Sequence, residues 1–460
     1  MRSLRSVPMV LVVSLIFAAG CGKKTPGNKP DGLTFEEARS SVMKQATAAQ
    51  GHGGEGAAAL EIPPEVPDFD IQSIPDGNNS FSLDFFHRQG QGKKGANLFC
   101  SPFSVYTALL MAYAGAEKTT KDEMRSVLHV VLEGEKLHKG FAYFWWLMKK
   151  KRNELVAANR IWTQTGLPVS NLFVNINRKY YGSSAERLDL MGDPAGSAKK
   201  INAWAAETTK DRIRDVVSAG DITPLTKLII TNAVYFNGTW DSKFKKEETK
   251  EEPFFLADGS SVKVPLMSQL GDFNYAEQPG LQVLEMPYLE NELSMWVFLP
   301  TAPDGKEAGN VDYGKLLESV ETSLTAESFA AIRAKATSTL AMVFFPRFRI
   351  DSMLRAGDTL KSMGMESALD PAAADFSGFF RAGEKPGQFF MADVVQKAFV
   401  DVNEEGTVAG AVTVVFNASA SSEPPKPVVF RADHPFVFLI MDNATKSILF
   451  IGRLASPTAS

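Results

Sequence analysis

The chain has 460 residues, of which 44% are hydrophobic and 22% charged, so it can form one large globular domain with additional segments. Its 49 basic and 53 acidic residues give a net charge of −4, which argues against a nucleic-acid-binding surface. The two cysteines, Cys21 and Cys100, lack the spacing of a CxxC motif or a metal site, and we expect neither a metal nor another cofactor.

The N-terminus is predicted to be a lipoprotein signal peptide over residues 1–20. Two early arginines precede an apolar stretch at 9–19, which is too short to span a bilayer comfortably. Residues 17–21 (FAAGC) resemble a bacterial lipobox, although Ala18 stands where leucine is commoner. We therefore expect Cys21 to be lipidated; the alternative is an ordinary secretory peptide with an incidental cysteine.

A tether is predicted over residues 21–75, because this stretch is rich in Gly, Pro, Ala and Ser, with a candidate helix over 34–49. It would hold a domain away from a bacterial membrane. Gly22 follows Cys21 in place of a retention-type aspartate, which favours the outer membrane or the cell surface, with secretion as the alternative. If Cys21 carries lipid, Cys100 has no disulfide partner, and its apolar neighbours predict that it is buried.

A globular domain is predicted over residues 76–460. Phe81 begins a helical face, Ser101 caps a helix that has Pro102 in its first turn, and Thr119 or Thr120 caps the next helix. Apolar runs then predict strands at 153–165, 228–236, 294–299, 340–350 and 394–402, and a closing hairpin at 436–441 and 447–451. Because helices come early and strands late, the expected fold class is α+β with large, mostly antiparallel sheets.

One stretch near the C-terminus stands apart. From 407 to 422 there is no charge and no proline, so the segment can form a strand, yet it ends in small polar residues that suit a loop. Such a segment must either be paired in a sheet already or be held out of one for a purpose.

Motifs of common enzymes are absent. The chain contains no GxSxG, no HExxH and no phosphate-binding glycine-rich loop, and none of its five histidines lies beside a nucleophile motif. The chain is therefore not expected to be an enzyme. A basic run at 149–152 could bind polyanions, but a solvated helix end explains it more simply.

Several short patches, in a fixed order, carry a resemblance to one family. They are NLFCSPFS at 97–104, TNAVYFNGTW at 231–240, FPRF at 345–348, KAFV at 397–400 with EEGT at 404–407, and HPFVF at 434–438. With these patches the chain resembles the serpins from about residue 76 to 457. The resemblance implies that a reactive loop, about residues 404–425, is held outside a five-stranded sheet as bait for a protease.

The resemblance also implies how such an inhibitor works. A protease that attacks the loop forms an acyl-enzyme, and the cut loop then inserts as an extra central strand and drags the protease along. Serpin loop insertion is itself a standard example of strand addition and of released strain. The implied partners are serine proteases and some cysteine proteases, together with a membrane through the lipid anchor. No nucleic acid is expected, and the chain is expected to be a monomer.

Three groups of site residues follow from the resemblance. The hinge comprises Glu404, Glu405, Gly406, Thr407, Ala409 and Ala411, and the reactive bond joins Ala420 to Ser421. The region where the sheet opens comprises Ser101, Ser104, Asn232, Gln396 and Trp240. Gln396 departs from the family, in which histidine is common at this position; an amide can still donate and accept but does not titrate.

The loop residues meet the demands of insertion. Thr407, Ala409 and Ala411 are small, and no charge would be buried unpaired. Side chains alternate between the two faces of an inserted strand, and the sequence does not decide which face turns towards the core. Hydrophobicity favours the face of Val408, whereas the family buries the face of Thr407. A small residue at Ala420 suits elastase-like or subtilisin-like proteases. The alternatives are a non-inhibitory serpin acting as a chaperone or carrier, and a surface-binding lipoprotein.

Overall fold

The computed structural model describes residues 66–457, except 94, 150–153, 184, 209–210, 212–213, 224–225, 227, 303–310, 385–388, 392 and 407–425. The predicted signal peptide, Cys21 and most of the tether, including its candidate helix, therefore lie outside the described residues. Within the described part, no helix combines the length and the apolar character that crossing a bilayer requires.

Helices form the first third of the described domain and recur later in the chain. They are α2 (Ser73–Gly90), α3 (Pro102–Tyr113), α4 (Lys118–Val127), α5 (Gly134–Lys149), α6 (Asn171–Tyr181), α7 (Pro194–Thr208), α8 (Tyr313–Ser323), α9 (Ala326–Lys335) and α10 (Gly357–Ser362). The predicted cap of α3 is confirmed, since the Ser101 hydroxyl accepts a hydrogen bond from the backbone N–H of Ser104. Every residue of α3 is buried, because this helix packs between β-strands of two sheets.

The predicted cap of α4 is wrong. The helix begins after Glu117, whose side chain makes no capping bond, and Thr120 lies inside its first turn. The buried Thr120 hydroxyl instead accepts hydrogen bonds from the Asp375 backbone N–H at 2.9 Å and the Ser367 hydroxyl at 3.1 Å. A long-range contact therefore uses the oxygen that a local pattern had assigned to the cap.

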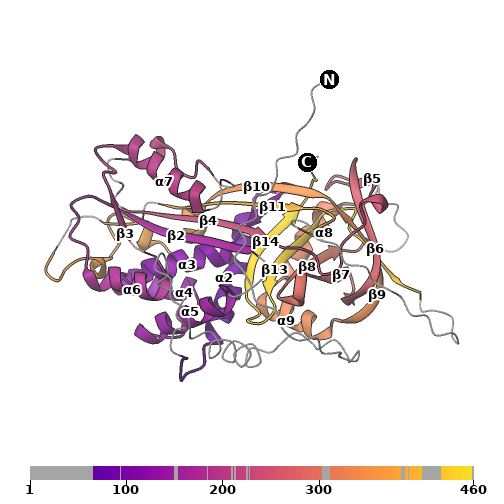
Figure 1. Cartoon of the computed structure of the whole chain (residues 1–460), viewed down its shortest axis with the longest axis horizontal. Coiled ribbons are helices and arrows are strands. Elements are labelled where there is room, and N and C mark those ends of the chain that lie inside the picture. The colour runs from indigo at the N-terminus through magenta and orange to yellow at the C-terminus, as the bar shows by residue number, and fades with distance from the viewer. Residues whose placement is uncertain are drawn as a thin grey trace, which may run out of the picture. The chain divides into compact units, whose positions relative to one another are not determined.

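A five-strand sheet crosses the domain, with α7 on one face and α3 on the other (Figure 1). In spatial order its strands are β10 (Phe348–Arg355), β11 (Val394–Val402), β4 (Leu228–Asn237), β2 (Glu154–Gln164) and β3 (Ala185–Leu188). The pairs β11–β4 and β2–β3 are parallel and the other two are antiparallel. Strands β11, β4 and β2 confirm three of the predicted strands.

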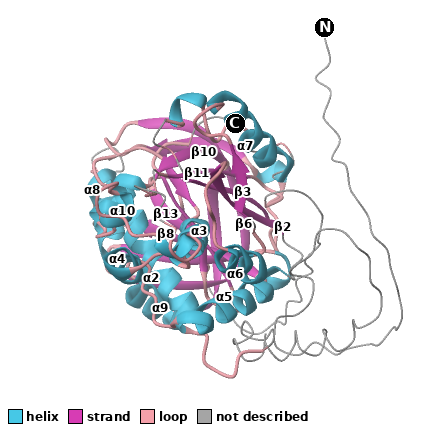
Figure 2. Cartoon of the chain, turned by 90° about the vertical axis from the view of Figure 1, so that its left-hand side faces the viewer, coloured by secondary structure: helices cyan, strands magenta, loops and turns pink. Residues whose placement is uncertain are grey.

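Among the described residues the second sheet has nine strands, and every pair is antiparallel except the last, β9–β12. Its strands are β1 (Leu98–Cys100), β14 (Ile448–Leu454), β13 (Phe436–Asp442), β8 (Leu293–Pro300), β7 (Leu281–Pro287), β6 (Ser261–Gln278), β9 (Thr337–Pro346) and β12 (Val428–Arg431), and β5 (Lys250–Phe255) also pairs with β6. The predicted closing hairpin is β13 and β14, and the α+β fold class is confirmed. Figure 2 shows helices wrapped around these strands.

The single strand predicted at 340–350 is in fact two strands in different sheets. Strand β9 ends at Pro346, which has no N–H to continue a ladder, and β10 starts at Phe348. Between them the backbone N–H of Arg347 donates to the Pro265 carbonyl at 2.9 Å. This residue carries the chain directly from the nine-strand sheet to the five-strand sheet.

Candidate functional site: the seam of the five-strand sheet

The parallel boundary between β11 and β4, here called the seam, is only partly paired. The ladder runs from Val394 opposite Ile230 to Ala398 opposite Val234 and stops there. The last four residues of β11 have no partner on β4 among the described residues, although both strands continue. The seam therefore has a paired end and a parted end. The predicted hinge comes directly after the parted end of β11 in the chain.

A tight turn, Asn403–Gly406, reverses the chain at the parted end; we call it the hinge turn. Asn403 and Gly406 exchange two backbone hydrogen bonds, of 3.1 and 3.2 Å. Gly406 also forms an isolated antiparallel bridge with Thr239, which lies beyond the end of β4. The chain thus leaves β11, turns, and already lies antiparallel beside the β4 side of the seam.

Only glycine fits the last position of the hinge turn. Gly406 has φ +106°, and a Cβ there would lie 2.4 Å from the Trp240 nitrogen and 2.6 Å from the Gly238 oxygen. Both atoms belong to the backbone, so they cannot move aside as a flexible side chain would. The glycine of the EEGT patch therefore permits the close approach of the hinge turn to Trp240.

Glu404 fastens the hinge turn to three residues that lie between strands: Thr249, Arg347 and Phe244. It is 4% exposed, and its carboxylate accepts a 2.8 Å hydrogen bond from the Thr249 hydroxyl. The Arg347 guanidinium lies 3.7 Å from the same carboxylate, and the Glu404 carbonyl accepts a 3.0 Å bond from the Phe244 N–H. A buried charge is tolerable here because it has both a hydrogen bond and a nearby cation.

Glu405 faces two lysines. Its carboxylate lies 3.1 Å from the Lys243 amine and 3.0 Å from the Lys246 amine. Neither lysine was identified from the sequence; the available signal was a basic run, SKFKK at 242–246, just after a predicted site tryptophan and opposite in charge to the EE pair.

Trp240 joins the hinge turn to the β4 side. Its indole N–H donates to the Asn403 carbonyl at 3.0 Å, and its backbone N–H donates to the Glu405 carbonyl at 3.2 Å. The buried ring stacks on Tyr288, with centroids 4.5 Å apart and planes inclined by 10°. The hinge turn, Trp240 and the ion pairs of Glu405 together form what we call the hinge end of the seam.

At the paired end, Gln396 holds the start of α3. Its amide oxygen accepts from the Ser101 backbone N–H at 2.9 Å, and its amide nitrogen donates to the Ser101 carbonyl at 2.8 Å. Gln396 is fully buried and stands in register with Asn232 on β4. We call this contact the clamp end. An amide supplies both the donor and the acceptor without any change of protonation.

The serines predicted for the sheet-opening region have different surroundings. The Ser101 hydroxyl donates to the Leu449 carbonyl at 2.7 Å, which ties α3 to β14. The buried Ser104 hydroxyl has no hydrogen-bond partner within the described residues. For Asn232 the structure gives the strand register only. The structure therefore brings Ser101, Gln396 and Asn232 together at the clamp end.

The remaining predicted site residues lie outside the described residues: Thr407, Ala409, Ala411, Ala420, Ser421 and Cys21. Cys100 is buried, as predicted, and burial raises the pKa of its thiol far above the ordinary value. Over the described ranges no cluster of three or more His, Cys, Asp or Glu residues is arranged to hold a metal ion.

Comparison with known proteins gives consistent similarities. The family model described as "Serpin (serine protease inhibitor)" matches residues 76–457. An uncharacterized serpin-like protein of Thermococcus kodakarensis is 37% identical over 383 residues, covering 82% of this chain and 84% of its own. The leukocyte elastase inhibitor of Xenopus tropicalis is 32% identical over 392 residues, covering 84% and 100%. The solved structure of Serpin48 from Tenebrio molitor, 30% identical, matches with a TM-score of 0.72 over 86% of this chain and all of its own.

Proposed function

Because the chain belongs to the serpin family, whose members are protease inhibitors and not enzymes, we propose that it traps serine-type endopeptidases as a suicide substrate. The protease serine attacks the carbonyl carbon of Ala420, the peptide bond to Ser421 breaks, and the amine of Ser421 leaves with a proton. The residues from Thr407 onward then insert into the seam before water can attack the acyl ester.

The observation that carries this proposal is the hinge end of the seam. The chain enters it antiparallel to β4, beside a stretch of β11 that has no ladder partner on β4 among the described residues. The following residues, 407–422, contain no charge and no proline, so they can continue the ladder without burying an unpaired charge. A strand added between β11 and β4 would be antiparallel to both.

We further propose that the target proteases have a small specificity pocket, as elastase-like and subtilisin-like enzymes do. Ala420 and its neighbours are small, and a trypsin-like pocket would require a cation. One relative is, by its name, an inhibitor of leukocyte elastase. Some cysteine proteases are further candidate targets.

Incubation with an elastase-like or a subtilisin-like protease, followed by a denaturing gel, tests the trap. We expect a covalent complex that survives boiling. Clean cleavage at Ala420 without a complex would contradict the trap and would favour a non-inhibitory serpin, a chaperone or carrier. No cleavage by either protease would favour a surface-binding lipoprotein.

A matched pair of variants tests insertion and settles which face turns inward. Thr407→Arg should convert the inhibitor into a substrate, because it would bury an unpaired charge early in the inserted strand. Val408→Arg places the same charge on the opposite face and should leave most of the complex yield intact. The reverse outcome would assign the inward face to Val408, and an unchanged yield for both variants would refute insertion.

For localisation, we propose that Cys21 is lipidated and that the tether holds the inhibitor at a bacterial outer membrane or cell surface. The lipobox-like residues 17–21 and the Gly/Pro-rich tether support this. Labelling with a radioactive fatty acid should mark the parent chain in the membrane fraction, and Cys21→Ser should abolish both the label and the membrane association. Unlabelled, freely secreted parent protein would contradict the anchor.

A further inference from the structure

Helix α7 and the segment after it cover the seam on the face opposite α3. We call the described residues 214–223 of this segment the strap. Trp162 of β2 and Ile229 of β4 share a buried apolar cluster with residues of α7, and Trp204 of the same helix packs against this cluster. Three strap residues, Val216, Val217 and Ile222, are buried in the same cluster, and so is Phe399 of β11. One apolar cluster therefore spans both sides of the seam.

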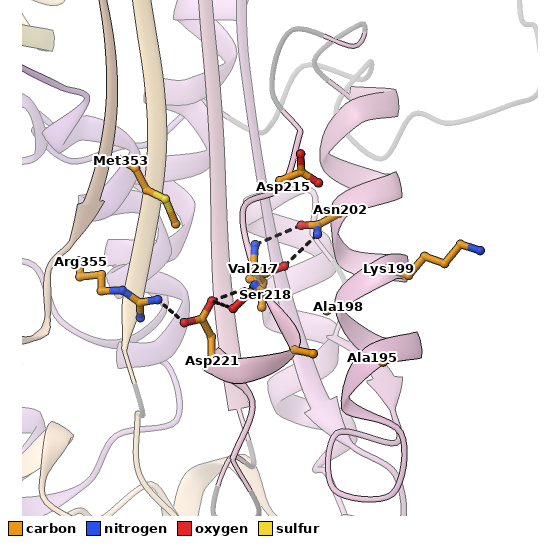
Figure 3. Close-up of a pocket in the computed structure, with 11 residues that line it drawn as sticks. Ala195, Ala198, Lys199, Asn202, Asp215, Val217, Ser218, Asp221, Met353 and Arg355 are labelled. Carbon is orange, nitrogen blue, oxygen red and sulfur yellow. Dashed lines mark hydrogen bonds and ion pairs between the residues drawn. The ribbon is translucent and has the colours of Figure 1, made fainter.

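The strap is fastened to α7. The Asn202 side chain donates to the Val217 carbonyl at 2.8 Å and accepts from the Val217 backbone N–H at 3.0 Å (Figure 3). Further along, the Asp221 carboxylate accepts 2.8 Å bonds from the Ser218 N–H and hydroxyl. These contacts hold the strap, including Asp221, in a fixed position beside α7 on the β4 side.

The strap is also tied to the β11 side of the seam. Arg355, the last residue of β10, pairs with Asp221 on the strap (Figure 3). It also lies 3.2 Å from Asp393, which directly precedes β11. Further along β11, the amine of Lys397 donates to the Arg214 carbonyl at 2.7 Å. Two cations from β10 and β11 thus reach across to the strap.

We propose that the Arg355–Asp221 ion pair is a latch that slows the opening of the seam; this rests on the trap mechanism proposed above. An inserted strand would move β11 and β10 away from β4 by about 4.8 Å, one strand spacing. If α7 stays packed on β2 and β4, the strap stays with it, and a direct ion pair cannot span the added distance. The latch must therefore break, or the strap must leave α7, before insertion is complete.

The surroundings of the latch predict its strength. The Arg355 side chain is half exposed, and the pair borders a cavity of about 640 Å³ lined by Ala195, Ala198 and Met353. Salt ions can therefore reach the pair, so its effect should be modest and screened. Breaking an ion pair of this kind should accelerate seam opening by about two- to five-fold.

The test uses the full chain and a synthetic peptide with the sequence of residues 407–418, whose incorporation into the sheet reports seam opening without any protease. Arg355→Ala should incorporate the peptide about two- to five-fold faster than the parent. Arg349→Ala is the matched control, because it removes the same charge from the same strand, where Arg349 pairs at 2.9 Å with Asp351. Equal rates for the two variants would overturn the latch.

Two further measurements assign the effect to the pair. Asp221→Asn should accelerate incorporation as Arg355→Ala does, and the double variant should be no faster than either single one. Raising the salt concentration from about 0.05 to about 0.5 M should accelerate the parent but leave Arg355→Ala nearly unchanged.

The outcomes separate the latch from the trap. Additive effects of the two substitutions, or equal salt responses, would overturn the latch while leaving the trap standing. A parent chain that neither incorporates the peptide nor forms a covalent complex would overturn both proposals.

Discussion

At the hinge end of the seam, the chain is held by ion pairs between Glu405 and two lysines and by a glycine turn against Trp240. At the clamp end, a buried neutral amide, Gln396, satisfies both backbone groups of Ser101. The Glu405 ion pairs are partly exposed and charged, whereas the contacts of Gln396 are buried and uncharged. The two ends should therefore differ in what it costs to open them.

The difference indicates where opening starts. An exposed ion pair contributes about 0.2–1 kcal/mol, whereas each buried polar group left without a partner costs about 1–3 kcal/mol. Opening at the clamp end would leave the Ser101 N–H and the Gln396 amide without these partners at once, whereas the Ser101 carbonyl would keep the backbone bonds from Ser104 and Val105. Opening should therefore proceed from the hinge end, where the ladder is already parted, towards the clamp end.

The largest effect is expected from Gln396→Ala. It leaves the buried N–H of Ser101 unsatisfied and creates a cavity, so the free energy of unfolding should fall by about 4 kcal/mol in a denaturant titration. Gln282→Ala is the control, because the Gln282 amide donates a 3.4 Å bond to the Val429 carbonyl near the surface, and the loss of this bond should change little. A small loss for Gln396→Ala would show that the clamp end is as weak as the hinge end.

Between about pH 6.5 and 4, we expect a pH dependence of stability from His138 on α5. Burial, followed by the nearby Lys121, lowers the pKa of His138 from 6.5 to about 4, and its ring nitrogen lies 2.8 Å from the Tyr181 hydroxyl. The unfolded chain therefore binds this proton more tightly. Stability should fall as the pH drops from about 6.5 to about 4, by about 3 kcal/mol in total, and this contribution should level off below pH 4.

Denaturant titrations of the parent and His138→Gln across this pH range measure that effect. The difference in unfolding free energy between the two proteins should change with pH in the predicted direction. When Gln396→His is added to the His138→Gln variant, the unfolding free energy should become dependent on pH again, because a titratable ring then stands at the clamp end. A parent and His138→Gln that respond identically to pH would contradict the assignment.

A smaller effect is expected at the hinge end from Gly406→Ala, about 2–3 kcal/mol, because the added Cβ would strain the backbone and meet the Trp240 nitrogen. Gly383→Ala is the matched control: Gly383 also has a positive φ, +86°, but no atom of the described residues lies within 4 Å of the position that a Cβ would take, so its cost should be about 1–2 kcal/mol. Hydrogen exchange of the Trp240 amide should rise for Gly406→Ala alone. Equal costs for the two variants would mean that the close approach at Trp240 is unimportant.

The smallest effect is expected from Glu405→Gln, which removes the charge that faces Lys243 and Lys246. The loss should be below about 1 kcal/mol and should vanish in high salt. Glu248→Gln, which breaks an exposed pair with Lys245 on one short turn, controls for the general change in charge. A large loss of unfolding free energy that does not depend on salt would contradict the description of the Glu405 ion pairs as weak and screened by solvent.

Much of the fold was predictable because its signals are local. The strand predicted at 394–402 coincides with β11, and the Ser101 cap and the closing hairpin were also identified. The two failures, the cap of α4 and the single strand at 340–350, occur where a distant segment decides the local structure: Asp375 and Ser367 use the Thr120 oxygen, and Pro265 binds Arg347 at the crossing between sheets.

The sequence by itself determined the family, the fold class and the uncharged, proline-free loop, because these depend on residue types and their order along the chain. The family resemblance already placed Ser101, Asn232 and Gln396 in one region, but only the tertiary structure decided which atoms meet at the two ends of the seam. Glu405 and Lys243 are 162 positions apart, and Gln396 and Ser101 are 295 apart. Periodicity along the chain does not encode the contacts within such pairs, because each depends on how two distant segments are brought together when the sheets pack.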